Sequence, residues 1–201
     1  MKVAVMASGR GSNFQAIIDS SERGEMPNAQ IVHLIADNKD AYAIQRASKH
    51  KIDYTVIESK KYSREDFEVR TLKVLQNKKV DVIVLAGFMR ILTSKFINSY
   101  KNKIINIHPS LLPSFPGAHA HRDTISYGAK ISGCTVHLVD EGVDTGPIIM
   151  QASLQVDENE TEETLSQKIL PLEHELLPRA LELFCSKKLK IDGRNVSIIT
   201  D

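Results

Sequence analysis

Residues 80–87 constrain the fold of this chain more than any other segment. Their sequence is Val-Asp-Val-Ile-Val-Leu-Ala-Gly, an almost unbroken run of β-branched and aliphatic side chains. Strands of this composition are buried on both faces, which is typical of parallel sheets covered by helices on each side. The run therefore predicts a central strand of an α/β protein.

Strand and helix patterns alternate along the first half of the chain. Apolar runs of strand length occupy residues 3–7, 30–36, 54–57 and 103–108. Apolar residues at helical spacing follow at 14–18, 41–49, from 63 onward, and at 93–100. This alternation predicts a right-handed, doubly wound, mostly parallel sheet.

The second half of the chain has a different pattern. Runs rich in β-branched residues at 133–139 and 148–156, separated by the acidic loop 140–147, predict an antiparallel hairpin added after the strand at 103–108. Residues 161–184 predict a helix that Pro171 kinks or breaks, and residues 189–199 a small extended addition.

Composition limits the classes of partner. With 201 residues and 42% hydrophobic content, the chain can bury one well-formed core, so we expect a single domain over 1–201. The formal charge of +1 provides no overall field for nucleic acid or a membrane surface. Cys134 and Cys185 show no spacing of a disulfide framework, and no apolar run approaches about 20 residues. We expect a cytoplasmic protein with reduced cysteines.

A glycine turn follows the first strand. Ser8-Gly9-Arg10-Gly11-Ser12-Asn13 leads directly into a helix, and backbone N–H groups at a helix start suit a phosphate. Phe14 occupies the third glycine position of a dinucleotide fingerprint, so a single phosphate fits better than NAD. A tight turn with a capped helix and no ligand remains the alternative.

Two polar residues lie near the end of the strand at 103–108. Strand periodicity puts the side chains of Asn106 and His108 on one face, and Pro109 stops the strand. Each buried polar group costs about 1–3 kcal/mol when it has no partner, so packing alone explains the pair poorly. The alternative is a capping Asn and a core His whose hydrogen bonds are satisfied.

Two further histidines could suggest a metal site. His119 and His121 lack a third ligand at metal-site spacing, so we expect no metal.

Five motifs together resemble the phosphoribosylglycinamide formyltransferases, folate-dependent enzymes of purine synthesis. They are Gly9-x-Gly11-Ser12-Asn13, Ala86-Gly87-Phe88-Met89-Arg90-Ile91-Leu92, Asn106-Ile107-His108-Pro109-Ser110-Leu111-Leu112-Pro113, Pro116-Gly117 and Asp144-Thr145-Gly146-Pro147. The resemblance implies a Rossmann-like formyltransferase fold, with a phosphosugar-binding half at 1–100 and a catalytic, folate-binding half at 101–201. It implies transfer of the formyl group of 10-formyltetrahydrofolate to the amine of glycinamide ribonucleotide in de novo purine biosynthesis, without a metal.

The resemblance also implies roles for individual residues. Asn106, His108 and Asp144 would be catalytic. The ribonucleotide would contact Gly11, Ser12, Asn13 and Glu173. Folate would contact Arg64, Met89, Arg90, Ile91, Leu92, Asn106, Asp140, Glu141, Gly142, Val143 and Asp144. The implied partners are these small molecules alone, without nucleic acid or membrane, in a monomer or homodimer.

Two alternatives are a formyltetrahydrofolate hydrolase and a non-catalytic phosphosugar or folate binding module. A hydrolase of this type would carry an extra amino-terminal domain, and a methionyl-tRNA formyltransferase a further carboxy-terminal one; neither extension is expected here. A binding module would not need the three catalytic residues. We expect Asp144 to lie within hydrogen-bonding reach of His108, directly or through one water. A nearby carboxylate favours the imidazolium, so we expect a raised His108 pKa, whereas burial alone would lower it.

Overall fold

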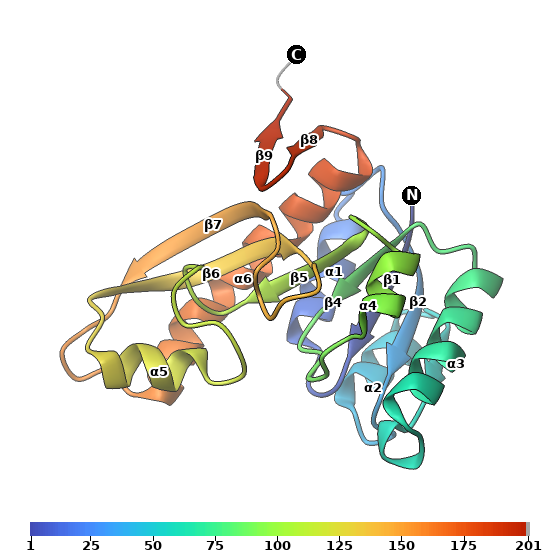
Figure 1. The fold of residues 1–201 in the computed structure, drawn as a ribbon, viewed down its shortest axis with the longest axis horizontal. Helices are drawn as coiled ribbons and strands as arrows, with labels where there is room; N and C mark the ends of the chain where they lie inside the picture. The colour runs from blue at the N-terminus through green and yellow to red at the C-terminus, as the bar shows by residue number, and fades with distance from the viewer. Residues whose placement is uncertain (200–201) are drawn as a thin grey trace.

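The structure, a computed structural model, describes residues 1–199 and is built around one seven-stranded sheet (Figure 1). The order across the sheet is β3-β2-β1-β4-β5-β6-β7. Its strands are β1 (Lys2–Ala7), β2 (Gln30–Ala36), β3 (Tyr54–Val56), β4 (Val82–Leu85), β5 (Ile104–His108), β6 (Ile131–Leu138) and β7 (Ile148–Gln155). Strands β1 to β5 pair in parallel, whereas β6 is antiparallel to both β5 and β7. The predicted mostly parallel sheet with an antiparallel addition is confirmed.

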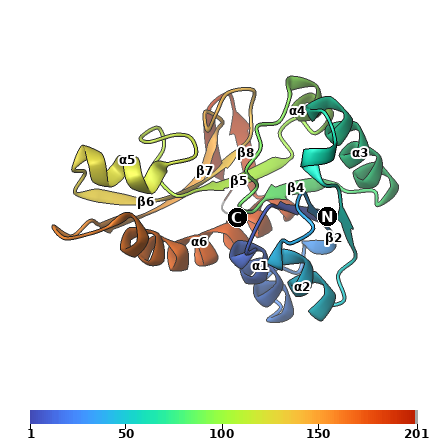
Figure 2. The same cartoon turned by 90° about the horizontal axis from the view of Figure 1, so that it is seen from below.

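Helices cover both faces of the sheet, as the doubly wound pattern predicts. Figure 2 shows α1, α2 and α6 on one side and α3 and α4 on the other. The helices are α1 (Ser12–Glu22), α2 (Tyr42–Lys49), α3 (Arg64–Asn77), α4 (Ser94–Ser99), α5 (Ala120–Tyr127) and α6 (Glu162–Cys185), with a short 3₁₀ turn at Ser59–Lys61. Within residues 1–199, none of these helices is both long and apolar enough to cross a bilayer.

Strand β1 shows why the central strands need apolar residues on both sides. Val3 and Val5 pack into the core beneath α1, α2 and α6, whereas Ala4 and Met6 pack into the core beneath α3 and α4. The four residues of β4 are likewise buried. Burial on both faces leaves the loops at the carboxyl ends of these strands as the places where polar groups can gather.

Two parts of the second half differ from the sequence prediction. Pro171 does not break α6, which continues through both Pro171 and Pro178. A proline in a helix loses one backbone hydrogen bond, and the apolar face of α6 along the sheet provides enough packing to keep the helix continuous. The helix α5 at Ala120–Tyr127 is also absent from the sequence prediction.

The end of the described chain forms a separate two-stranded hairpin, β8 (Leu189–Asp192) and β9 (Asn195–Ile198). Figure 1 shows it beyond the end of α6, above β7. At its turn, the Nη1 atom of Arg194 donates to the carbonyl oxygen of Thr145 at 2.8 Å. The hairpin therefore contacts the 140–147 loop that joins β6 to β7.

Candidate active site

The pairing of β5 with β6 assembles the polar side chains of the site. Asn106 lies opposite His137, and His108 lies opposite Thr135. Side chains of directly paired residues project from the same face of a sheet. One face of these two strands therefore carries an amide, two imidazoles and a hydroxyl, as the sequence predicted for Asn106 and His108.

Asp144 comes back over this face from the β6–β7 loop. Its Oδ2 atom lies 3.4 Å from His108 Nδ1, and its Oδ1 atom lies 3.4 Å from the Asn106 Nδ2 donor. The backbone N–H of Gly117 donates to Oδ2 at 2.8 Å. Asp144 has a positive φ of 53°, a conformation that is uncommon for a residue with a side chain. The predicted approach of Asp144 to His108 is confirmed.

The turn that carries Asp144 is tightly closed. Asp140 Oδ1 accepts hydrogen bonds from the Thr145 hydroxyl at 2.6 Å and from the Gly142 N–H at 3.2 Å. A Cβ added at Gly146 would lie 1.8 Å from the carbonyl oxygen of Leu138, so only glycine fits there. These contacts give the Asp144 backbone a defined position over the sheet.

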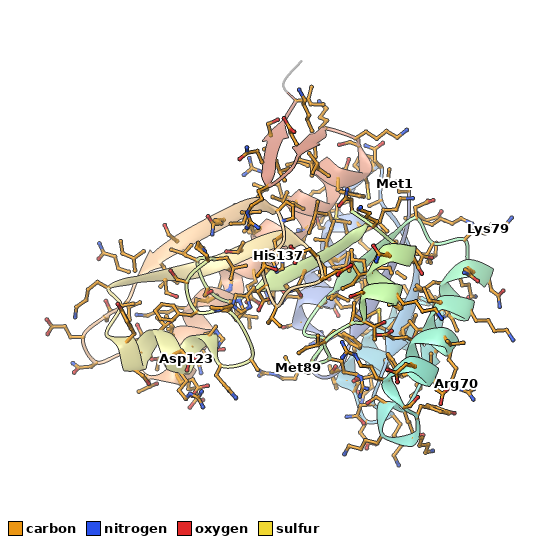
Figure 3. All side chains as sticks on the ribbon, in the orientation of Figure 1. Met1, Arg70, Lys79, Met89, Asp123 and His137 are labelled. Carbon is orange, nitrogen blue, oxygen red and sulfur yellow. The ribbon has the colours of Figure 1, made fainter. Side chains whose placement is uncertain are left out.

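His137 belongs to the same cluster, although the sequence analysis did not single it out. It is buried, and its Nε2 atom lies 3.1 Å from Asn106 Nδ2 and 3.5 Å from Asp144 Oδ1. Figure 3 labels it near the middle of the molecule, on β6. A histidine between Val136 and Leu138 in an apolar strand was a detectable signal, but its partner depends on the strand register.

The charges in this cluster shift two pKa values. Burial by itself would raise the pKa of Asp144, but the hydrogen bonds from His137 and the Gly117 N–H, with the charges of His108 and His137, lower it to about 2. Burial lowers the pKa of His108, and this outweighs the Phe115 carbonyl and the Asp144 charge, which both raise it. The predicted rise of the His108 pKa is therefore wrong, because desolvation of the ring exceeds the attraction of the carboxylate.

Each ring nitrogen of His108 faces an acceptor. Nε2 lies 2.8 Å from the carbonyl oxygen of Phe115, and Nδ1 faces Asp144 Oδ2. A neutral imidazole has one N–H and can satisfy only one of these acceptors, whereas the imidazolium satisfies both. Burial opposes the charged form and the two acceptors favour it, so this ring is placed to take up and release a proton.

The glycine loop forms the second part of the site, beside the carboxyl end of β1. Gly11 has a φ of 66° at the start of α1, and a Cβ added there would lie 2.7 Å from the Cβ of Ala43. A cleft of about 280 Å³ opens at this loop. It is lined by Ser8, Gly9, Arg10, Gly11, Ser12, Asn13, Ala86, Gly87 and Met89.

The structure brings together Asn13 and Glu173, two predicted ribonucleotide contacts that lie 160 positions apart. The Asn13 Nδ2 atom donates to Glu173 Oε2 at 2.7 Å, and both residues are buried. Burial raises the pKa of Glu173, although the Asn13 hydrogen bond opposes the rise. The Oδ1 atom of Asn13 is buried without a hydrogen-bond partner.

The predicted folate contacts lie in two groups. In the segment after β4, Met89 and Ile91 are 75% and 62% exposed, whereas Leu92 is buried in the core beneath α3 and α4. The guanidinium of Arg90 lies 5.1 Å from the centre of the Phe67 ring. In the β6–β7 loop, Val143 is exposed and Glu141 accepts a hydrogen bond from Asn98. Leu92 is thus buried, whereas Met89 and Ile91 are open to a ligand.

Arg64 lies apart from the polar cluster, in the first turn of α3. Its side chain is 41% exposed, and its Nε atom lies 3.9 Å from Oε1 of Glu68. The Glu68 carboxylate also accepts hydrogen bonds from the backbone N–H and the hydroxyl of Thr93. Because the Arg64 side chain is exposed and its contact to Glu68 is long, it can attract an anionic group at the surface.

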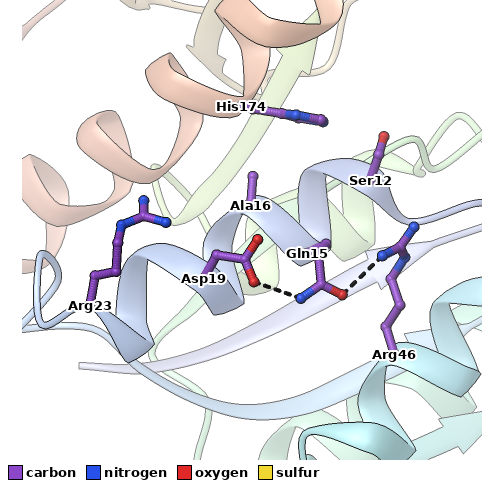
Figure 4. Close-up of a pocket in the computed structure, with 7 residues that line it drawn as sticks. All are labelled: Ser12, Gln15, Ala16, Asp19, Arg23, Arg46 and His174. Carbon is purple, nitrogen blue, oxygen red and sulfur yellow. Dashed lines mark hydrogen bonds between the residues drawn. The ribbon is translucent and has the colours of Figure 1, made fainter.

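A separate groove lies between α1, α2 and α6 (Figure 4). Within it, Gln15 donates to Asp19 at 2.7 Å and accepts from Arg46 at 2.9 Å. Of the predicted site residues, only Ser12 lines this groove. Across residues 1–199, His, Cys, Asp and Glu side chains form no group of three that could hold a metal ion.

Sequence comparisons match most of the chain. A family model described as formyl transferase covers residues 1–181. The phosphoribosylglycinamide formyltransferase of Bacillus subtilis is 43% identical over 182 residues, which cover 90% of this chain and 93% of that protein. The trifunctional purine biosynthetic protein adenosine-3 of Drosophila pseudoobscura is 45% identical over 94% of this chain. The chain spans only 14% of the length of that trifunctional relative.

Structural comparisons agree. The glycinamide ribonucleotide transformylase 1 of Symbiobacterium toebii has a TM-score of 0.97 and 41% identity, covering 100% of this chain and 94% of that one. A formyltetrahydrofolate deformylase from Pseudomonas syringae has a TM-score of 0.92 but 25% identity, and this chain covers 66% of it. The chain therefore belongs to the formyl transferase family, within its phosphoribosylglycinamide formyltransferases.

Proposed function

We propose that this protein transfers the formyl group of 10-formyltetrahydrofolate to the primary amine of glycinamide ribonucleotide, in de novo purine biosynthesis, without a metal. The observation that carries this proposal is the cluster in which Asp144 lies 3.4 Å from both His108 and Asn106. The nearby glycine loop supports it, because its cleft suits the phosphate of a ribonucleotide. The names and the 41–43% identity of the relatives support the choice of substrates.

The reaction requires no nucleophile from the protein. The amine nitrogen attacks the formyl carbon, a new C–N bond forms, and the carbonyl electron pair moves to oxygen. When the oxyanion collapses, the bond to N10 of folate breaks. The attacking nitrogen loses one proton and N10 gains one, so the step needs an oxyanion donor and a group that moves a proton.

Asn106 is the oxyanion donor in this proposal. Its Nδ2 atom lies 3.1 Å from His137 Nε2 and 3.4 Å from Asp144 Oδ1. These contacts orient the amide, and the N–H that makes the longer contact to Asp144 turns to the oxyanion when the substrate binds. Preorganised donors of this kind contribute roughly 2.7–4 kcal/mol to a transition state. His137 is a positioning residue here, since it contacts the amide of Asn106 and not the reacting atoms.

His108 moves the proton and Asp144 stabilises the charge that the ring then carries. The ring is neutral in the buried free site, because burial lowers the His108 pKa. Asp144 stays ionised, since its pKa is about 2. An ionised carboxylate beside the ring makes proton uptake by His108 possible at the moment when the amine becomes acidic.

The two substrates occupy adjoining parts of the site in this proposal. Backbone N–H groups of Gly11, Ser12 and Asn13 bind the phosphate at the start of α1, and Glu173 contacts the ribonucleotide. Folate lies against Met89, Arg90, Ile91 and Leu92 on one side and the Asp140–Asp144 loop on the other. Arg64 attracts the glutamate carboxylates of folate.

The test is a formyl-transfer assay with purified protein, both substrates, and mass spectrometry of the ribonucleotide product. We expect a mass gain of one formyl group with the wild type and almost none with His108→Gln. A reaction that consumes 10-formyltetrahydrofolate equally well without the ribonucleotide would identify a hydrolase instead. Binding of both ligands without turnover would identify a binding module. Loss of activity with a chelator, restored by a metal, would contradict the metal-free reaction.

A further inference from the structure

Three residues lie in one row across β5, β6 and β7. Strand register pairs His108 with Thr135, and Thr135 with Gln151. The segment 110–115, which follows His108, contacts both of the other residues in this row. Thr135 is fully buried, with an apolar neighbour on either side in β6.

The hydroxyl of Thr135 uses its whole hydrogen-bonding capacity on this segment and on Gln151. It donates to the carbonyl oxygen of Ser110 at 2.7 Å. It accepts from the backbone N–H of Leu112 at 3.1 Å and from Nε2 of Gln151 at 2.9 Å. A hydroxyl has one donor and two acceptor positions, so no capacity remains.

Gln151, on β7, hydrogen-bonds to both Thr135 and the 110–115 segment. Its Nε2 atom donates both to the Thr135 hydroxyl and to the carbonyl oxygen of Leu112, each at 2.9 Å. Three backbone groups of the segment, from Ser110 and Leu112, are therefore held by one hydroxyl and one amide. We call this set of contacts the 110–112 clamp.

The clamp connects to the proton-moving ring through the rest of the segment. The Ser110 hydroxyl, fully buried, lies 2.6 Å from the carbonyl oxygen of Ser114 and 3.3 Å from that of Phe115. The Phe115 carbonyl accepts from His108 Nε2 at 2.8 Å, and Phe115 has a positive φ of 52°. A non-glycine residue keeps such a conformation only where the surrounding contacts impose it.

We propose that Thr135, assisted by Gln151, is a positioning residue for formyl transfer, because it fixes the 110–115 segment whose Phe115 carbonyl orients the His108 ring. This proposal rests on the proposed function, in which His108 moves the proton. A core role alone would be served by Val, which has nearly the shape of Thr and carries no polar group. The hydroxyl is needed because its removal leaves backbone groups of the segment unpaired.

The orientation of His108 can be measured separately from activity. Three groups act on the ring: the Phe115 carbonyl, Asp144 from the β6–β7 loop, and His137 from β6. The Phe115 carbonyl and Asp144 favour the charged ring, and His137 disfavours it. The charge of His108 in turn lowers the pKa of His121 on α5. If the clamp loosens and Phe115 withdraws, the His108 pKa falls further, while the Asp144 contribution remains.

The experiment compares Thr135→Val with Thr135→Ser, which keeps the hydroxyl and loses one methyl group. We expect Thr135→Val to lower kcat about 10- to 100-fold, the scale of a small misplacement of a reacting group, and Thr135→Ser to stay within about threefold of wild type. The KM for the ribonucleotide should change little, because the glycine loop lies on another part of the sheet. NMR titration should show a lower His108 pKa in Thr135→Val but not in Thr135→Ser.

Gln151→Leu provides a second variant on an edge strand, where misfolding is less of a concern if Thr135→Val fails to fold. It should shift kcat and the His108 pKa in the same direction by a smaller amount. Equal kcat in the Val and Ser variants, or a lower kcat with an unchanged His108 pKa in both Thr135→Val and Gln151→Leu, would overturn the proposal. If the wild type shows no formyl transfer, the proposed function fails, whereas the titration still reports whether the clamp orients His108.

Discussion

The parallel and antiparallel sides of the sheet build their parts of the site in different ways. On the parallel side, the glycine loop offers backbone groups from the consecutive residues 11–13 at the end of β1. On the antiparallel side, side chains from β5, from β6 and from the following loop meet within 3.5 Å. The first arrangement is local in sequence, and the second depends on strand register.

Because of this difference, we expect the two parts of the site to respond differently to substitutions. A site made of backbone N–H groups tolerates changes of side-chain charge but not the addition of a Cβ where the chain needs a positive φ. A site made of paired buried charges loses its chemistry when one charge is removed, even if its shape is kept. Four predictions test this comparison.

The largest effect is expected for Asp144→Asn, on the antiparallel side. The amide keeps the shape but cannot stabilise a charged His108, so kcat should fall about 10²- to 10⁴-fold with little change in either KM. Steady-state kinetics with both substrates check this. Asp123→Asn, which removes a carboxylate paired with Arg122 on α5, is the control and should remain near wild type. Near-normal turnover of Asp144→Asn would remove Asp144 from the mechanism.

Lowering the pH should remove the stabilisation that the ionised Asp144 carboxylate gives to the fold. The pKa of Asp144 is lowered from 3.8 to about 2 in the folded protein, so its ionisation stabilises the fold above pH 4. That contribution, at most about 2.4 kcal/mol or a factor of about 60 in the unfolding equilibrium, is lost as the pH falls from 4 toward 2. Urea unfolding of wild type and Asp144→Asn should be measured between pH 6 and pH 3. The difference between their free energies of unfolding should become smaller as the pH falls. A difference that stays constant with pH would contradict this assignment.

On the parallel side, Gly11→Ala should raise the KM for the ribonucleotide about tenfold, the size expected from strain of 1–3 kcal/mol. The new Cβ meets Ala43 and the backbone φ is unfavourable, while the folate KM should hardly change. Gly24→Ala, at a positive φ with open space around it, is the control for backbone strain alone. Adding Ala43→Gly should restore part of the ribonucleotide affinity, and an equal rise of both KM values would exclude a phosphate role for the loop.

The smallest effect is expected for Arg64→Ala, because this side chain is exposed and its attraction is screened by salt. Polyglutamylated folate should bind about two- to fivefold more weakly at low salt, and the monoglutamate less so. Lys73→Ala, which removes another cation from α3, should not distinguish the two folates. Titrations of both folates at two salt concentrations check this, and equal weakening of the two forms would reject it.

The sequence predicts most of the fold because its elements are local. The strand predicted at 80–87, which the structure places at Val82–Leu85, depends on neighbouring residues only. So does the N-cap of α3 at Ser63, whose hydroxyl accepts from the Asp66 N–H. The helix does not break at Pro171, because packing along the whole of α6 outweighs one lost hydrogen bond. A helix of eight residues at α5, in a segment punctuated by Pro and Gly, gives a weak periodic pattern.

The site was predictable in part. Period 2 places Asn106 and His108 together, but the proximity of His137 and Thr135 follows from pairing between strands some 30 residues apart. The sign of the His108 pKa shift depends on how deeply the ring is buried, which no short motif encodes. Asp144 was found only through the resemblance to the family.

The contact between Arg194 and Thr145 links the tail of the chain to the loop that carries Asp144. The family match ends at residue 181, whereas the β8–β9 hairpin lies at 189–198 and reaches the residue next to Asp144. A substitution at Arg194 would therefore remove a support of this loop without changing any side chain of the polar cluster.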